Sequence, residues 1–228
     1  MKRMVIFALA LCLVLPAVSA MADDGGWTVS LKAGYGFGDI SGGATDPGVD
    51  ANATSTGFDD EDGWLAAMAV GYDWSGQGVD LRTEVEYSFY HGVDYDAQNT
   101  TAADKADMSA DIDVQTLMFN VYYDFENSTS FTPYIGVGAG IAMISCDVDY
   151  GAGYGVGVNV ADGDADATNF AWSVSGGVSY ELTDYVDLDL QVRYVDFGDT
   201  DEYADGNYKF QADDLSSTDV LIGVRYTF

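Results

Sequence analysis

Charges spaced two residues apart are the side chains of this sequence with the clearest capacity for chemistry. Arg82 stands between Asp80 and Glu84, and Arg193 follows a pair of aspartates on another segment. In an extended chain, residues two apart share one face. Such charges either stabilise each other as ion pairs in a confined interior or line a narrow path for small ions. The set that we expect on one interior face is Lys32, Arg82, Glu84, Glu86, Glu181, Asp187, Asp189, Arg193 and Arg225.

Enzymatic chemistry is not expected. Hydrolysis of the common kind needs a histidine as the acid–base group. His91 is the only histidine, and Ser88, three residues earlier, would point to the opposite face of a strand. The glycine repeats at 136–140 and 153–157 are not phosphate-binding loops because no helical pattern follows either. We expect no catalytic residue and no cofactor.

Acidic clusters at 59–62 and 162–166 superficially suggest calcium binding. The second cluster lacks the glycine and the bidentate glutamate of an EF-hand. Two interpretations stay open: weak binding of divalent ions, or a solvated loop whose charges repel one another. We expect no defined metal site.

The N-terminus has the anatomy of a secretory signal peptide. Residues 1–3 are basic, residues 4–15 are apolar but too few for a membrane-spanning helix, and residues 17–20 are small. We expect residues 1–20 to be removed, with cleavage after residue 22 as an alternative. Residues 21–228 then form one domain.

Removal of the signal peptide makes an acidic chain more acidic. It takes away Lys2 and Arg3, so the formal net charge falls from −30 to −32. This charge excludes nucleic acid as a partner, and it excludes attachment to anionic head groups through a basic patch. Cys146 becomes the only cysteine, so no intrachain disulfide is expected.

Eight segments alternate apolar and polar residues with the period of a β-strand. In the clearest of them, Val79, Leu81, Val85, Tyr87 and Phe89 share one face. The expected strands cover 27–37, 64–74, 79–89, 116–125, 131–143, 170–181, 186–194 and 219–228.

The connections between these segments alternate in length. Those at 75–78, 126–130 and 182–184 are short, whereas those at 38–63, 92–112, 147–169 and 198–216 are long. All the long connections must therefore leave the same end of an up-and-down antiparallel barrel. Short periplasmic turns and long extracellular loops are typical of transmembrane β-barrels.

A soluble barrel would bury its apolar face, whereas a membrane barrel turns that face outward. All the tryptophans lie on the apolar face near expected strand ends, which suits the two membrane interfaces. The polar face is rich in glycine, which leaves room for long side chains in a narrow lumen. We therefore predict an all-β, eight-stranded antiparallel up-and-down transmembrane β-barrel with four long extracellular loops. A soluble periplasmic or secreted barrel is the alternative.

Segments 132–140, 187–194 and 224–228 resemble the small outer-membrane β-barrels typified by the OmpA transmembrane domain, OmpX and the Ail- and Opa-like surface proteins. The resemblance covers the whole mature chain. It implies export through the periplasm to the outer membrane, contact with lipid and lipopolysaccharide, and folding by the barrel-assembly machinery. It also gives the terminal aromatic, Phe228, the role of assembly signal.

The expected function is structural or surface-interactive, with a lumen filled by the charged network, and the protein is expected to be a monomer. Two alternatives stay open. One is adhesin-like binding through the acidic extracellular loops, and the other is a narrow porin-like channel for small ions.

Phe228→Ala should reduce the amount of folded protein in the outer membrane, because the assembly machinery is expected to read the terminal aromatic. Molecules that do fold should keep an unfolding free energy within about 0.5 kcal/mol of the wild type. The heat-modifiable fraction of outer-membrane protein on gels measures the folded amount, and urea unfolding measures the unfolding free energy. Tyr226→Ala is the control, and equal folded amounts of the two variants would contradict the assembly role.

Overall fold

The computed structural model describes residues 26–45, 62–98, 107–150, 164–198, 203–205 and 208–228, so the predicted signal peptide lies outside it. The strands are β1 (Gly26–Thr45), β2 (Asp62–Asp73), β3 (Leu81–Gln98), β4 (Asp107–Asp124), β5 (Phe131–Tyr150), β6 (Asp164–Thr183), β7 (Val186–Gly198), β8 (Tyr203–Asp205) and β9 (Tyr208–Thr227). A single 3-10 turn, η1 (Ser75–Gln77), is the only helical element in these ranges.

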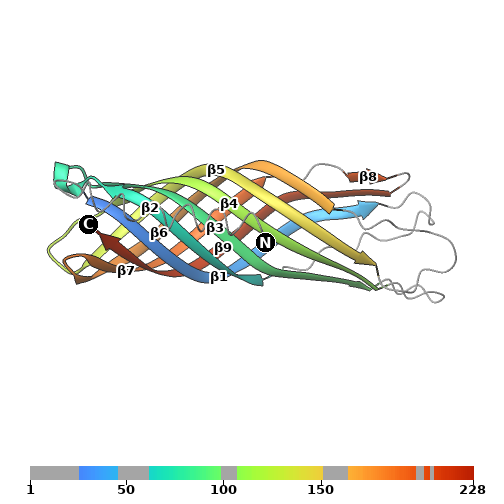
Figure 1. The fold of residues 1–228 in the computed structure, drawn as a ribbon, viewed down its shortest axis with the longest axis horizontal. Helices are drawn as coiled ribbons and strands as arrows, with labels where there is room; N and C mark the ends of the chain where they lie inside the picture. Colours follow the sequence, from blue (N-terminus) through green and yellow to red (C-terminus); the bar gives the residue numbers. More distant parts are fainter. Residues whose placement is uncertain (1–25, 46–61, 99–106, 151–163, 199–202, 206–207) are drawn as a thin grey trace.

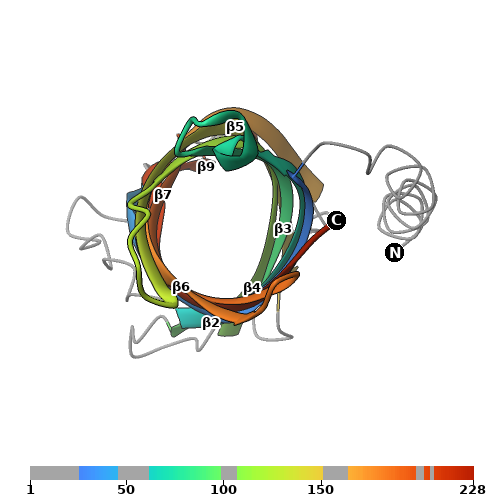
Figure 2. The same ribbon diagram turned by 90° about the vertical axis from the view of Figure 1, so that its left-hand side faces the viewer.

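The strands form one antiparallel sheet that closes on itself. Each strand pairs with the next one along the chain, and β7 continues to β9. The first strand then pairs with the last, from Thr28 opposite Thr227 to Thr45 opposite Lys209. Figure 1 shows the strands tilted against the long axis, and Figure 2 shows the ring they make. The predicted eight-stranded antiparallel barrel is confirmed; the short β8 pairs with β9 outside the ring.

The period of two gives the wall two chemically different faces. Leu31, Phe170 and Ile222 are more than 60% exposed on the outside, although they are large and apolar. Their inward neighbours are polar or small, and Glu86 and Asp219 are completely buried. An outward apolar belt with charged groups inside is the arrangement required when hydrocarbon surrounds the barrel.

The predicted loops are wrong in extent, because the strands continue past the apolar belt. The structure extends β1 to Thr45 and β3 to Gln98, and it pairs Met108 of β4 with Tyr150 of β5. The strand ends predicted from the sequence lie where the outward apolar residues stop, that is, at the edge of the apolar belt. Backbone hydrogen bonds need no apolar face, so the ladders persist in water beyond that edge.

Candidate functional site: a charged network across the lumen

Lys32 on β1 and two glutamates on β3 begin the network inside the barrel. The Lys32 Nζ lies 2.6 Å from an oxygen of Glu86 and 3.1 Å from an oxygen of Glu84. All three side chains are buried. The alternation in β3 points Glu84 and Glu86 to the same face, so one ammonium reaches both carboxylates.

Arg193 on β7 carries the network to the opposite wall. Its Nη1 lies 2.5 Å from Glu86 on β3, and its Nη2 lies 2.8 Å from Asp219 on β9. In the closed ring, β4, β5 and β6 separate β3 from β7 on one side, and β2, β1 and β9 separate them on the other. The Arg193–Glu86 ion pair therefore spans the lumen.

Hydroxyl groups complete the hydrogen bonding of these carboxylates. Tyr90 donates to Asp219 at 2.9 Å and accepts from Arg193 at 2.8 Å. Ser88 donates to Glu86, and Ser217 donates to Asp219. Tyr90 is not among the residues predicted from the sequence, although it shares the parity of Ser88 on β3 and therefore the same face. Buried charges are tolerated when they are paired and hydrogen-bonded in this way.

Arg82 occupies the end of the lumen nearest the short turns. Its Nη1 contacts Glu84 at 2.5 Å, and its Nε lies 3.3 Å from Asp124 on β4. Its guanidinium carbon lies 4.3 Å from the centre of the Tyr122 ring, a cation–π distance. Gly136 makes room for that ring, because a Cβ there would lie 2.4 Å from it.

Arg225 on β9 forms a second group near the same end. Its Nη2 lies 3.1 Å from Asp187 and 3.2 Å from the hydroxyl of Ser179, and its Nη1 lies 3.8 Å from Asp189. Ser179 donates in turn to Asp189. The structure thus brings together all the predicted network residues except Glu181, whose side chain is exposed at the end of β6. Asp124 and Asp219 contribute to the network in addition.

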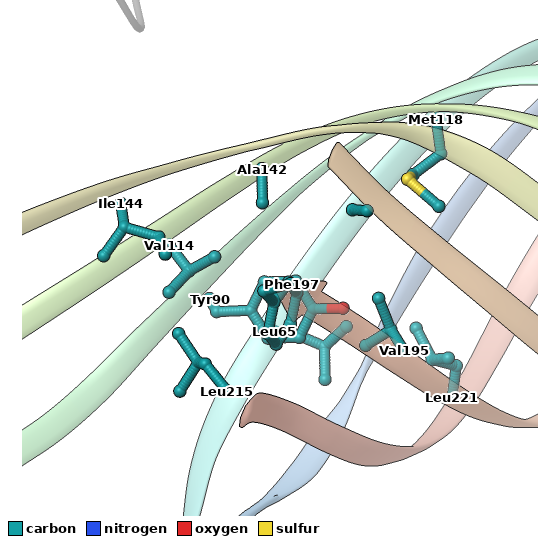
Figure 3. Packing of buried hydrophobic residues seen from close by; sticks show 11 residues of the cluster. Leu65, Tyr90, Val114, Met118, Ala142, Ile144, Val195, Phe197, Leu215 and Leu221 are labelled. Atoms are coloured by element: carbon teal, nitrogen blue, oxygen red, sulfur yellow. The ribbon is translucent and has the colours of Figure 1, made fainter. Parts of the chain in front are cut away.

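On the side of the long connections, an apolar layer of buried side chains packs in the lumen, and these residues are not among those predicted from the sequence. Figure 3 shows Leu65, Tyr90 and Phe197 packed together, with Val195 and Leu215 beside them. The rings of Tyr90 and Phe197 meet edge to face at 5.1 Å. Tyr90 therefore joins the apolar layer to the charged layer below it.

The remaining chemical candidates lie apart from this network. The ring of His91 is exposed on the outer face, 3.1 Å from Asp113, whereas Ser88 is buried inside. No group of three or more metal-ligating side chains occurs within the residues that the structure describes. Phe228 follows β9, where its N–H donates to the carbonyl of Trp27 and its ring packs against Tyr226.

A closed antiparallel barrel with an apolar outer face and paired charges inside is an integral membrane β-barrel. The profile of the family described as "Outer membrane protein beta-barrel domain" matches residues 7–228, and the chain belongs to that family. It is therefore a protein of the outer membrane of Gram-negative bacteria, surrounded by lipid and lipopolysaccharide.

Individual relatives agree with this assignment. The chain is 31% identical over 172 residues to outer membrane protein PagN of Salmonella typhimurium, which covers 71% of each chain. Among solved structures, Neisserial surface protein A superposes with a TM-score of 0.51 at 22% identity, covering 89% of this chain and 97% of that one. OprG of Pseudomonas aeruginosa gives a TM-score of 0.50 at 16% identity, covering 90% and 97%.

Replacing Arg193 by Met should lower the free energy of unfolding by about 3–5 kcal/mol, because Asp219 would remain buried without a cation and Glu86 would keep only Lys32. Urea unfolding followed by tryptophan fluorescence measures the change. Gln191→Met is the matched control. It lies on the same strand and face, is buried, and its amide has no hydrogen-bond partner in the described part of the chain. If both variants unfold at the same urea concentration, water screens the network and the lumen is open.

Proposed function

We propose that this barrel is a non-enzymatic surface-interaction protein. Its closed lumen serves as a membrane anchor, and its acidic extracellular part binds positively charged partners. The observation that carries the proposal is the buried Arg193–Glu86 ion pair across the lumen. Because this ion pair occupies the lumen, we assign the function to the part of the chain outside the membrane.

The packing of the lumen supports an anchor over a channel. An ion moving through would have to separate buried ion pairs that are also hydrogen-bonded. It would then have to enter the apolar layer around Leu65 and Phe197, where hydration is lost without compensation. Eight-stranded barrels have an interior only wide enough for side chains to fill.

The strands beyond the apolar belt support a cationic partner. Asp94 of β3 is the register partner of Asp111 of β4, which is opposite Asp147 of β5. Asp147 in turn is opposite Asp164 of β6. Like charges directly opposite one another destabilise a sheet. Register thus sets four acidic positions side by side across adjacent strands, and a positively charged partner suits such a row, so the aspartate row (Asp94, Asp111, Asp147 and Asp164) is the part that we assign to binding.

The closed ring also supports a monomer that is folded by the barrel-assembly machinery. Within the described ranges, every strand of the ring has two neighbours. No second copy is needed to satisfy backbone groups at membrane depth, which is the usual demand on a spanning structure.

The purified wild-type protein should give no resolved single-channel steps in a planar lipid bilayer. Arg193→Ala combined with Phe197→Ala empties both layers at one wall, and this variant should produce steps. This double variant serves as the positive control that the protein has inserted into the bilayer. Steps of defined size from the wild type would overturn the closed-lumen half of the proposal.

Cells that display the wild-type protein should adhere to a poly-lysine surface, and adherence should fall as salt rises, because screening weakens exposed charges. Changing every aspartate of the aspartate row to Asn should reduce adherence at low salt. The matched control removes as many charges at the opposite end of the barrel: Asp73→Asn, Asp80→Asn, Glu181→Gln and Asp184→Asn. Equal adherence of the two variants would contradict the assignment.

A further inference from the structure

A groove of about 420 Å³ opens on the outer wall of the barrel, across β1, β2, β3 and β4. Its walls are Trp27, Tyr72 and Trp74 on one side and Val85 and Phe119 on the other. Trp74 lies in the connection from β2 to β3, next to η1, so the groove is at the short-turn end of the barrel (Figure 1). The short turns of outer-membrane barrels lie in the periplasm.

The groove exists because one outward position in a row of large side chains is small. Register places Trp27 beside Tyr72, Tyr72 beside Thr83, and Thr83 beside Val121. Thr83 leaves a gap next to the Tyr72 ring, and Val85 and Phe119 bound that gap from the adjacent row. A side chain of leucine size at position 83 would project into the middle of it and narrow it.

The walls of the groove are held in place before anything binds. The indole N–H of Trp74 donates to the hydroxyl of Thr83 at 3.2 Å, and the amide of Gln77 donates to the hydroxyl of Tyr72 at 3.1 Å. The Tyr72 ring meets both indoles edge to face, at 5.4 Å from Trp27 and 4.7 Å from Trp74. A preorganised site loses little conformational entropy on binding.

The position of the groove defines the chemistry of its occupant. It opens on the apolar outer face, so hydrocarbon is what surrounds it in the membrane. Its periplasmic end lies beside the tryptophan and tyrosine side chains that favour the head-group region. An acyl chain of a periplasmic-leaflet phospholipid fits both conditions.

The charges at the same end favour one class of head group. Asp73 precedes Trp74 in the chain, and Asp80 lies between Gln77 and Thr83. Backbone hydrogen bonds join Asp80 to Asp124 and Asp124 to Glu126, so the turns that carry these carboxylates lie side by side. Desolvation and the neighbouring Asp80, Asp73 and Asp124 raise the pKa of the Glu126 carboxyl. The described cations at this end, Arg82 and Arg225, are both buried in the lumen, where each is paired with carboxylates. An ammonium is therefore attracted here, and a head group with net negative charge is repelled.

We propose that this groove is a binding site for one phospholipid. Its acyl chain lies against Trp27, Tyr72, Trp74 and Phe119, and the carboxylates of the adjacent turns select an ammonium-bearing head group of the phosphatidylethanolamine type. The site is separate from the surface-binding function proposed above.

Native mass spectrometry of the full-length protein in mild detergent tests the site. Phosphatidylethanolamine and phosphatidylglycerol with identical acyl chains are added in equal amounts. The wild type should retain one molecule of the ethanolamine lipid with about tenfold preference, the scale set by one charge-assisted contact. Equal retention of the two lipids would overturn the head-group assignment.

Matched variants locate the bound lipid. Thr83→Leu obstructs the middle of the groove and should strongly reduce retention, whereas Thr218→Leu makes the same change at an exposed outward position on β9 and should not. If both variants retain the lipid equally, the groove is not the site. Trp74→Ala, which removes one wall, replaces Thr83→Leu if that variant fails to assemble. The double variant Asp80→Asn, Glu126→Gln should still retain a lipid, but its ratio of ethanolamine to glycerol lipid should fall close to one. An unchanged ratio would show that these carboxylates do not select the head group.

Discussion

Closure of the β1–β9 ladder is the constraint on which the rest of the structure depends. Hydrocarbon offers no partner to backbone N–H and C=O groups, so a spanning sheet must have no free edge. The pairing of β1 with β9, from Thr28–Thr227 to Thr45–Lys209, leaves the sheet without a free edge. The outer face is then free to carry a belt of apolar residues, and Leu31, Phe170 and Ile222 face the lipid. Charged side chains at the level of this belt, such as Lys32, Glu86 and Arg193, point inward.

A ring this small determines how its interior is used. The lumen is only as wide as two opposing side chains, so Arg193 on one wall reaches Glu86 on the other. Glycines make this possible, because a Cβ at Gly138 would lie 2.1 Å from the side-chain oxygen of Asn120. The buried charges cost desolvation energy, but each cation contacts at least one carboxylate and the key carboxylates accept further hydrogen bonds. Beside them, towards the long connections, lies the apolar layer of buried side chains.

The distribution of charge differs between the lumen and the ends of the barrel. Lysine and arginine side chains in the described part concentrate in the lumen, where they neutralise most of the buried acids. At the end nearer the long connections, strand register sets four aspartates opposite one another. At the short-turn end, the acidic turns border an apolar groove. Two different partners, one cationic and one lipid, fit these two ends.

The sequence by itself determined which way each side chain in the barrel faces. A period of two is a local property, so Lys32, Arg82 and Arg193 could be assigned to the interior without knowing their neighbours. The partners were decided only by tertiary structure, because Arg193 and Glu86 are 107 residues apart. Facing inward does not specify height along the barrel axis, which depends on the stagger of all the strands together. For this reason Glu181 shares the predicted face yet lies at the rim, while Tyr90 and Phe197 meet at the level where charge gives way to an apolar core.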